Sequence, residues 1–172
     1  MPIPFLWLGV GLGALAAGKH LARERSRDIV LHHPGESQQS AAILNGAVVC
    51  CGVFGVFDHS GIWMDGSIIE LNGNGLIRAV SPQRFLANRS GDKIFVACDA
   101  DGNVLADLQA GERAVARVFE YSAYDLMRNN CHQFVLSCLT PGVGHVTLFN
   151  ELNISVSRHF GQSLSWRPAF GV

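Results

Sequence analysis

The chain carries little charge, and its cysteines are not spaced as a structural metal site requires. Only 16% of its 172 residues are Asp, Glu, Lys or Arg, and the formal net charge is −1. The sequence lacks the basic patch that a nucleic-acid-binding surface needs. No C-x-x-C pair occurs among the five cysteines, which argues against structural zinc and against a disulfide framework. We therefore expect free thiols in a reducing compartment, no nucleic-acid partner, and no metal or other cofactor.

The composition is that of a folded protein. Apolar residues make up 48% of the sequence, enough for a hydrophobic core and unlike a disordered chain. Nineteen glycines indicate many tight turns, as a fold that contains a sheet requires. The length fits one domain with an appendage.

The first residues predict a membrane anchor. Residues 2–18 are uncharged and mostly apolar, and Lys19 and three arginines follow closely. This length is at the lower limit for crossing a bilayer. The basic flank places the following domain on the cytoplasmic side, so we expect an apolar anchor helix over residues 1–18. Two alternatives remain, a buried helix of a soluble domain and a leader cleaved near the A-x-A pattern at residues 14–16.

Residues 19–46 predict a polar link into the domain, with a turn at residues 34–37. Two adjacent histidines in this link, His32 and His33, could suggest a metal site. Neighbouring residues of a regular element point in different directions. We therefore interpret both as solvated loop residues.

The domain core begins with strands. Residues 47–57 predict a buried strand or strand pair, broken at a glycine and holding Cys50 and Cys51 in the core. Asp65-Gly66 predicts a type I′ hairpin turn. In that hairpin Ile62 faces Ile69 and Gly61 faces Glu70, which brings His59 close to Glu70 on the diagonal.

The later residues predict alternating helices and strands before a C-terminal extension over residues 141–172. The expected elements are a strand over 76–80, a helix over 81–86 capped by Ser81, a strand over 93–98, a helix over 112–121 that buries Val115, Val118 and Phe119, and a short amphipathic helix over 145–152. The end of the extension is expected to be poorly ordered.

A reactive cysteine is predicted at the start of one further helix. Asn129 or Asn130 would cap this helix, placing Cys131 in its first turn, where free N–H groups and the helix dipole favour a thiolate. Either Cys131 or His59 alone would most simply be structural. Together they form a candidate nucleophile and base, and Glu70 is placed to fix the imidazole tautomer.

Two stretches carry a family resemblance. His59–Gly73 reads HSGIWMDGSIIELNG and Tyr124–Phe134 reads YDLMRNNCHQF. They are similar to motifs of the LRAT-like (lecithin–retinol acyltransferase-like) branch of the permuted NlpC/P60 thiol hydrolases, in which the histidine precedes the cysteine. The resemblance implies an α+β, circularly permuted NlpC/P60 (papain-like) core over residues 47–140. In such a core a small antiparallel sheet packs on the helix that bears the cysteine.

By this resemblance Cys131 is the nucleophile and His59 the base. Glu70 departs from the pattern, because many LRAT-like proteins carry a second histidine at its position. The Cys131 backbone N–H would hold the oxyanion, beside a second donor that the sequence does not identify. We interpret Tyr124 as a packing residue and expect His132 to point away from the site.

The leading hypothesis is a cysteine-dependent hydrolase or acyltransferase that works through an acyl-thioester on Cys131. Its expected substrates are lipid acyl esters or other acyl-bearing molecules at the membrane. If the domain is exported instead, an amidase or peptidase acting on cell-wall or protein peptides becomes the better choice. A catalytically silent binding module of the same fold is a further alternative, suggested by Glu70. A metal site built from Cys131, His132 and Cys138 ranks last because its spacing does not suit one helix face.

Overall fold

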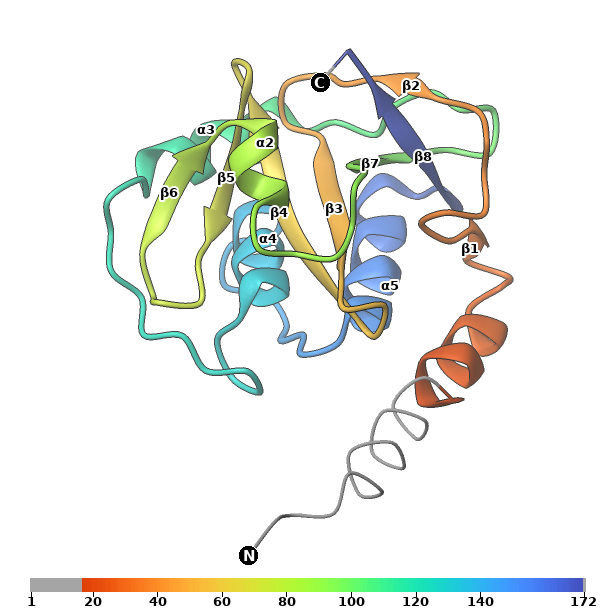
Figure 1. The fold of residues 1–172 in the computed structure, drawn as a ribbon, viewed down its shortest axis with the longest axis horizontal. Coiled ribbons are helices and arrows are strands. Elements are labelled where there is room, and N and C mark those ends of the chain that lie inside the picture. Colours follow the sequence, from red (N-terminus) through yellow and green to blue (C-terminus); the bar gives the residue numbers. More distant parts are fainter. Residues whose placement is uncertain (1–16, 172) are drawn as a thin grey trace, which may run out of the picture.

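The computed structural model describes residues 17–171, which form an α+β fold around a mixed sheet (Figure 1). In this part of the chain the strand order is β1-β8-β7-β3-β4-β5-β6, and β2 also pairs with β8. The strands are β1 (Val30–His32), β2 (Ala41–Ala42), β3 (Val48–Val53), β4 (Phe57–Met64), β5 (Ser67–Leu71), β6 (Ile77–Val80), β7 (Phe95–Cys98) and β8 (Leu164–Phe170). The strands from β8 to β6 are antiparallel, whereas β1 and β2 run parallel to β8. The expected small antiparallel sheet is thus the centre of a larger, mixed one.

Helices cover both faces of the sheet. On one face α3, α4 and α5 enclose a core that includes Phe134, Leu152 and Trp166, and on the other α2 places Phe85 over a second core. Figure 1 shows α4 and α5 behind the sheet and α2 in front of it. The helices are α2 (Pro82–Leu86), α3 (Leu108–Ala116), α4 (Cys131–Leu139) and α5 (Phe149–Phe160). A further helical stretch, residues 17–25, precedes β1.

The hairpin register predicted from Asp65-Gly66 is confirmed. Ile62 pairs with Ile69 between β4 and β5. Asp65 and Gly66 have φ values of 47° and 78°, the left-handed conformations that a type I′ turn needs at both central positions. The hairpin fixes how the chemistry-bearing residues of β4 and β5 face one another.

Two helix starts follow their predicted caps. The Ser81 side chain accepts a hydrogen bond from the Arg84 N–H at the start of α2. Asn130 caps α4, its side chain accepting from the N–H groups of His132 and Gln133. Cys131 is therefore the first residue of α4, where the helix dipole stabilises negative charge.

The helix expected over residues 112–121 lies earlier in the chain, and its predicted buried face is right only for Val118, which packs partly buried against the core. Asp107 caps α3, which ends at Ala116. Val115 is 44% exposed and Phe119 84% exposed. Small residues form the buried face instead, because Gly111 approaches β4 so closely that a Cβ atom there would lie 2.8 Å from the Met64 sulfur.

The C-terminal stretch is ordered, contrary to the prediction for its end. The helix starts at Phe149, not His145, and continues to Phe160. After it, β8 pairs with β7 and buries Leu164 and Trp166. This stretch is rich in glycine and serine, so its composition did not indicate the helix face that buries Leu152 and Val156. Residues assigned to the link and the extension thus meet in one sheet, since β1 and β2 pair with β8.

The predicted membrane anchor falls on residues 1–18, nearly all of which lie outside the described residues. Within residues 17–171, no helix combines the length and apolarity needed to cross a bilayer.

Candidate active site

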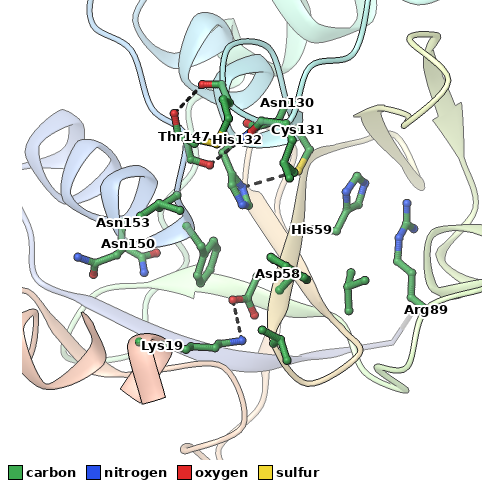
Figure 2. A pocket seen from close by; sticks show the side chains of 18 of the residues that line it. Lys19, Asp58, His59, Arg89, Asn130, Cys131, His132, Thr147, Asn150 and Asn153 are labelled. Atoms are coloured by element: carbon green, nitrogen blue, oxygen red, sulfur yellow. Dashed lines mark hydrogen bonds and ion pairs between the residues drawn. The ribbon is translucent and has the colours of Figure 1, made fainter. Parts of the chain in front are cut away.

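Cys131 lies in the wall of a pocket formed between the start of α4, the start of β4 and the start of α5. The pocket has a volume of about 640 Å³, and His59, His132 and Phe149 also line it. Only 3% of Cys131 is exposed. Figure 2 shows His59 and His132 on either side of this cysteine.

His59 and Glu70 meet as the hairpin register predicts. The His59 Nε2 atom lies 2.7 Å from Glu70 Oε2, and both side chains are buried. An ionised carboxylate can only accept a hydrogen bond, so Nε2 carries the proton. The second ring nitrogen, Nδ1, is then free to accept a proton from the Cys131 thiol.

Two arginines hold Glu70 in its charged form. Arg78 donates from Nε and Nη2 to Glu70 Oε1 at 2.9 and 2.7 Å, and Arg89 Nη2 donates to Oε2 at 3.0 Å. Burial raises the pKa of Glu70, but the hydrogen bond and charge of His59, together with the arginines, outweigh it and lower the pKa to about 2. The carboxylate is therefore ionised at neutral pH and keeps His59 in one tautomer.

The charges around Cys131 favour a thiolate. Burial raises the pKa of Cys131, but the positive charges of His132 and His59 and their hydrogen bonds to the sulfur hold it well below its ordinary value. For His59, burial lowers the pKa, while Cys131 and then Glu70 raise it above its usual value overall. The pair is thus poised to form a thiolate and an imidazolium.

His132 belongs to the site, and the expectation that it points away is wrong. Its Nδ1 atom lies 3.8 Å from Cys131 Sγ and 2.8 Å from Ser60 Oγ. Consecutive strand residues point to opposite faces, so β4 directs His59 to one side of the sulfur and Ser60 to the other. The Ser60 hydroxyl holds the His132 ring against the cysteine.

Replacing His132 with glutamine should make Cys131 less reactive at mildly acidic pH. Removing the imidazole removes a positive charge that lowers the pKa of the thiol, so the pH midpoint of alkylation shifts upward. We expect iodoacetamide to react about two- to tenfold more slowly at pH 6. The exposed His20→Gln variant is the control, and identical pH profiles for wild type and His132→Gln would contradict the prediction.

Tyr124 packs partly against the core, which agrees with its predicted role, and it also lines the pocket. Burial, followed by the charge of the Cys131 thiolate, raises the pKa of its hydroxyl to about 12. The hydroxyl keeps its proton at neutral pH and can act as a donor.

His33 is not the solvated loop residue that the sequence suggested. Its side chain is only 2% exposed and lines the same pocket. The turn after β1 folds the histidine inward, where its own backbone N–H donates to Glu36 Oε2 at 2.9 Å. Burial, then the charge of Arg23, lowers the pKa of His33, which favours the neutral form of the ring. His32 is exposed as expected and lies 3.1 Å from Ser165 Oγ.

The other cysteines are structural. Cys50 and Cys51 are buried in the sheet, as predicted, and Cys98 and Cys138 are buried as well. Burial raises the pKa of Cys51 to about 12 and of Cys98 to about 11. Among residues 17–171, no group of three or more His, Cys, Asp or Glu side chains could hold a metal ion.

The prediction missed Ser60, Arg78 and Arg89. Ser60 could have been found, since it follows His59 and must face the other side of β4. Arg78 pairs with Glu70 across β5 and β6, a register that the Asn72–Gly75 turn could have supplied. Arg89 follows α2, and nothing local connects it to Glu70.

Comparisons with protein-family models, with curated proteins and with solved structures found no match to this chain.

Proposed function

We propose that this chain is a cysteine-dependent hydrolase or acyltransferase that forms an acyl-thioester on Cys131. The observation that carries the proposal is the thiol at the first position of α4, with His59 on one side and His132 on the other. Glu70 orients the His59 ring through its hydrogen bond with Nε2. The motif resemblance to LRAT-like proteins supports the same roles, and the α+β architecture is compatible with it.

In the first step, His59 Nδ1 takes the proton of the Cys131 thiol, and the sulfur attacks the substrate carbonyl carbon. The carbonyl electron pair moves to oxygen. The resulting oxyanion would receive hydrogen bonds from the Cys131 backbone N–H and from Tyr124, our candidate for the second donor. Collapse of this intermediate breaks the bond to the leaving group, which takes the proton from the His59 imidazolium.

In the second step, water or another acceptor resolves the thioester. His59 removes a proton from the acceptor as it attacks the acyl carbon, and the carbon–sulfur bond then breaks. The proton returns to the Cys131 sulfur. The product is a free acid if the acceptor is water, or a transferred acyl group if it is an alcohol or amine.

The pocket suits an acyl chain. Its wall includes Val53, Phe57, Met127 and Leu148, of which the last three are 49%, 63% and 59% exposed. Exposed apolar side chains around a pocket mark a surface that contacts apolar ligands or a membrane. Lipid acyl esters at the membrane that residues 1–18 would engage, from the cytoplasmic side, remain the first choice of substrate.

The test is to trap the acyl-enzyme. We expect wild-type protein mixed with a p-nitrophenyl alkanoate to gain the mass of one acyl group. Neutral hydroxylamine should remove that group because it cleaves thioesters. Intact-protein mass spectrometry measures both changes, and peptide mapping should place the adduct on Cys131.

The matched control is a second buried thiol on the same helix. Cys138→Ala should label like wild type, whereas Cys131→Ala should not label. Labelling of Cys131→Ala equal to that of wild type, or no labelling of folded wild-type protein, would refute the proposal. The second result would favour the silent binding module.

A further inference from the structure

Several residues that line the pocket carry a buried polar atom without a hydrogen-bond partner. Within residues 17–171, five buried side-chain nitrogen or oxygen atoms have no such partner. Four of them belong to residues that line this pocket, namely His33, Arg89, Asn150 and Asn153. Because buried polar groups are nearly always hydrogen-bonded, such atoms at a ligand-sized pocket point to groups that a ligand satisfies.

Asn153 gives the clearest of these observations. Its side chain is 1% exposed, and its Oδ1 atom accepts a hydrogen bond from Trp166 Nε1 at 3.1 Å. An indole N–H can only donate, so the Asn153 amide cannot be turned the other way. Its Nδ2 group is therefore a buried donor of fixed orientation with no protein partner among residues 17–171.

Asn150 adds a second buried polar group on the same face of α5. Residues three apart on a helix are neighbours, with Cβ atoms about 5–6 Å apart. The Asn150 Oδ1 atom is buried and has no partner in the described chain. No hydrogen bond within residues 17–171 orients this amide, so Asn150 can turn its oxygen or its NH₂ group toward a ligand. Figure 2 shows both asparagines at the end of the pocket opposite Arg89.

Aromatic contacts connect this end of the pocket to the nucleophile. His132, which contacts Cys131, lies 5.5 Å from Phe149 between ring centroids, and Phe149 lies 5.3 Å from Trp166. Trp166 in turn holds Asn153. A substrate seated at Cys131 and extending along Phe149 would reach the two asparagines with a part remote from the reacting carbonyl.

The two free groups define the chemistry of that remote part. The charges of Asp58 and Lys19, which also line the pocket, largely cancel, since their ion pair measures 2.9 Å. The hydrogen-bonding groups of the two asparagines are therefore the features that select a ligand group here: Asn153 offers a fixed donor, and Asn150 can turn its oxygen toward an N–H. A neutral ligand group with an acceptor and a donor on separate atoms satisfies both asparagines, and an amide is such a group.

We propose that Asn153 and Asn150 form a subsite for an amide group of the substrate, with Asn153 donating to its carbonyl oxygen and Asn150 accepting from its N–H. This inference rests on the proposed function, because it assigns the subsite to the substrate of Cys131. It adds that the substrate carries an amide in addition to the bond that is cleaved. A peptide and an N-acylated lipid both contain this group.

The test measures binding alone, in the full-length Cys131→Ala protein, which cannot turn over an ester. Three probes of similar length are titrated while the asparagine side-chain signals are followed by ¹H–¹⁵N NMR: N-hexylacetamide, hexyl acetate and 1-octanol. We expect the amide to bind about tenfold more tightly than the ester or the alcohol. It should also shift the Asn153 side-chain signal.

Two variants, each made in the Cys131→Ala background, separate the donor from the acceptor. Asn150→Leu should weaken binding of N-hexylacetamide about tenfold and leave hexyl acetate unchanged, because an ester has no N–H. Asn153→Leu should weaken both probes, since both contain a carbonyl. Asn150→Leu leaves the Trp166 hydrogen bond intact, so it remains informative if Asn153→Leu unfolds. Asn103→Leu, in an exposed turn, is the control and should bind like the parent.

Equal affinities for the amide and the ester in the Cys131→Ala protein would overturn the subsite. An amide preference that survives in Asn150→Leu, or tighter binding of 1-octanol, would do so too. A further comparison separates a peptide substrate from an N-acylated lipid. Tighter binding of N-acetylalanine methylamide than of N-hexylacetamide identifies a peptide amide, and the reverse order identifies a lipid amide. The binding measurements use proteins without the Cys131 thiol, whereas acyl-enzyme trapping uses the wild-type protein. A negative binding result therefore counts against the subsite alone, and a negative trapping result counts against the proposed enzyme activity alone.

Discussion

Replacing His59 with alanine is expected to lower kcat/KM for a p-nitrophenyl ester about a thousandfold, the middle of the range for loss of a general base. His59 Nδ1 is the nitrogen free to deprotonate Cys131, since Nε2 is engaged by Glu70. Without the imidazole, the Cys131 thiol also loses one of the positive charges that lower its pKa. Steady-state release of p-nitrophenolate measures the loss.

The same variant should keep part of its thiol reactivity. His132 remains beside the sulfur at 3.8 Å, so iodoacetamide should still alkylate Cys131 in His59→Ala faster than in the His59→Ala/His132→Gln double variant. Circular dichroism and urea unfolding show whether both proteins are folded. Activity of His59→Ala within threefold of wild type would show that His59 is not the base.

Local rules explain why so much of the centre of the fold could be predicted. The Asp65-Gly66 turn fixes the register of β4 and β5, and that register brings His59 to Glu70. The asparagine cap fixes where α4 begins and hence the position of Cys131. Each inference depends on residues close together in the sequence, whose geometry the backbone dictates.

The rest of the site depends on contacts between distant segments. His132 faces the sulfur because Ser60, on a different element, holds its ring. Asn153 and Trp166 orient each other across α5 and β8, in a C-terminal extension whose last residues were expected to be poorly ordered. His33 is buried by the packing of the chain around β1, although its neighbour His32 is exposed. Side-chain pairs of this kind follow no local pattern, so the sequence alone could place neither the second histidine nor the asparagines.

Glu70→Gln is expected to cost about 3–5 kcal/mol of unfolding free energy at pH 7, the usual cost of removing one partner from a buried ion pair. Glu70 has no exposed surface and pairs with Arg78 and Arg89. A neutral amide leaves these guanidinium groups without a counter-charge, and its NH₂ group cannot accept their hydrogen bonds. Urea unfolding of wild type and variant gives the difference.

The pH dependence of the difference in unfolding free energy tests whether the Glu70 charge causes it. The pKa of Glu70 is lowered from 4.5 to about 2 in the folded protein, and a lowered pKa stabilises the fold at pH values above the unfolded pKa. This contribution, about 3 kcal/mol for a shift of that size, should be complete above pH 4.5 and disappear as pH falls toward 2. The stability gap between wild type and Glu70→Gln should therefore narrow across this window.

The gap between wild type and Glu112→Gln, a variant at an exposed glutamate, should stay small and constant. A gap for Glu70→Gln that does not change with pH would mean that the loss comes from packing and not from the carboxylate charge.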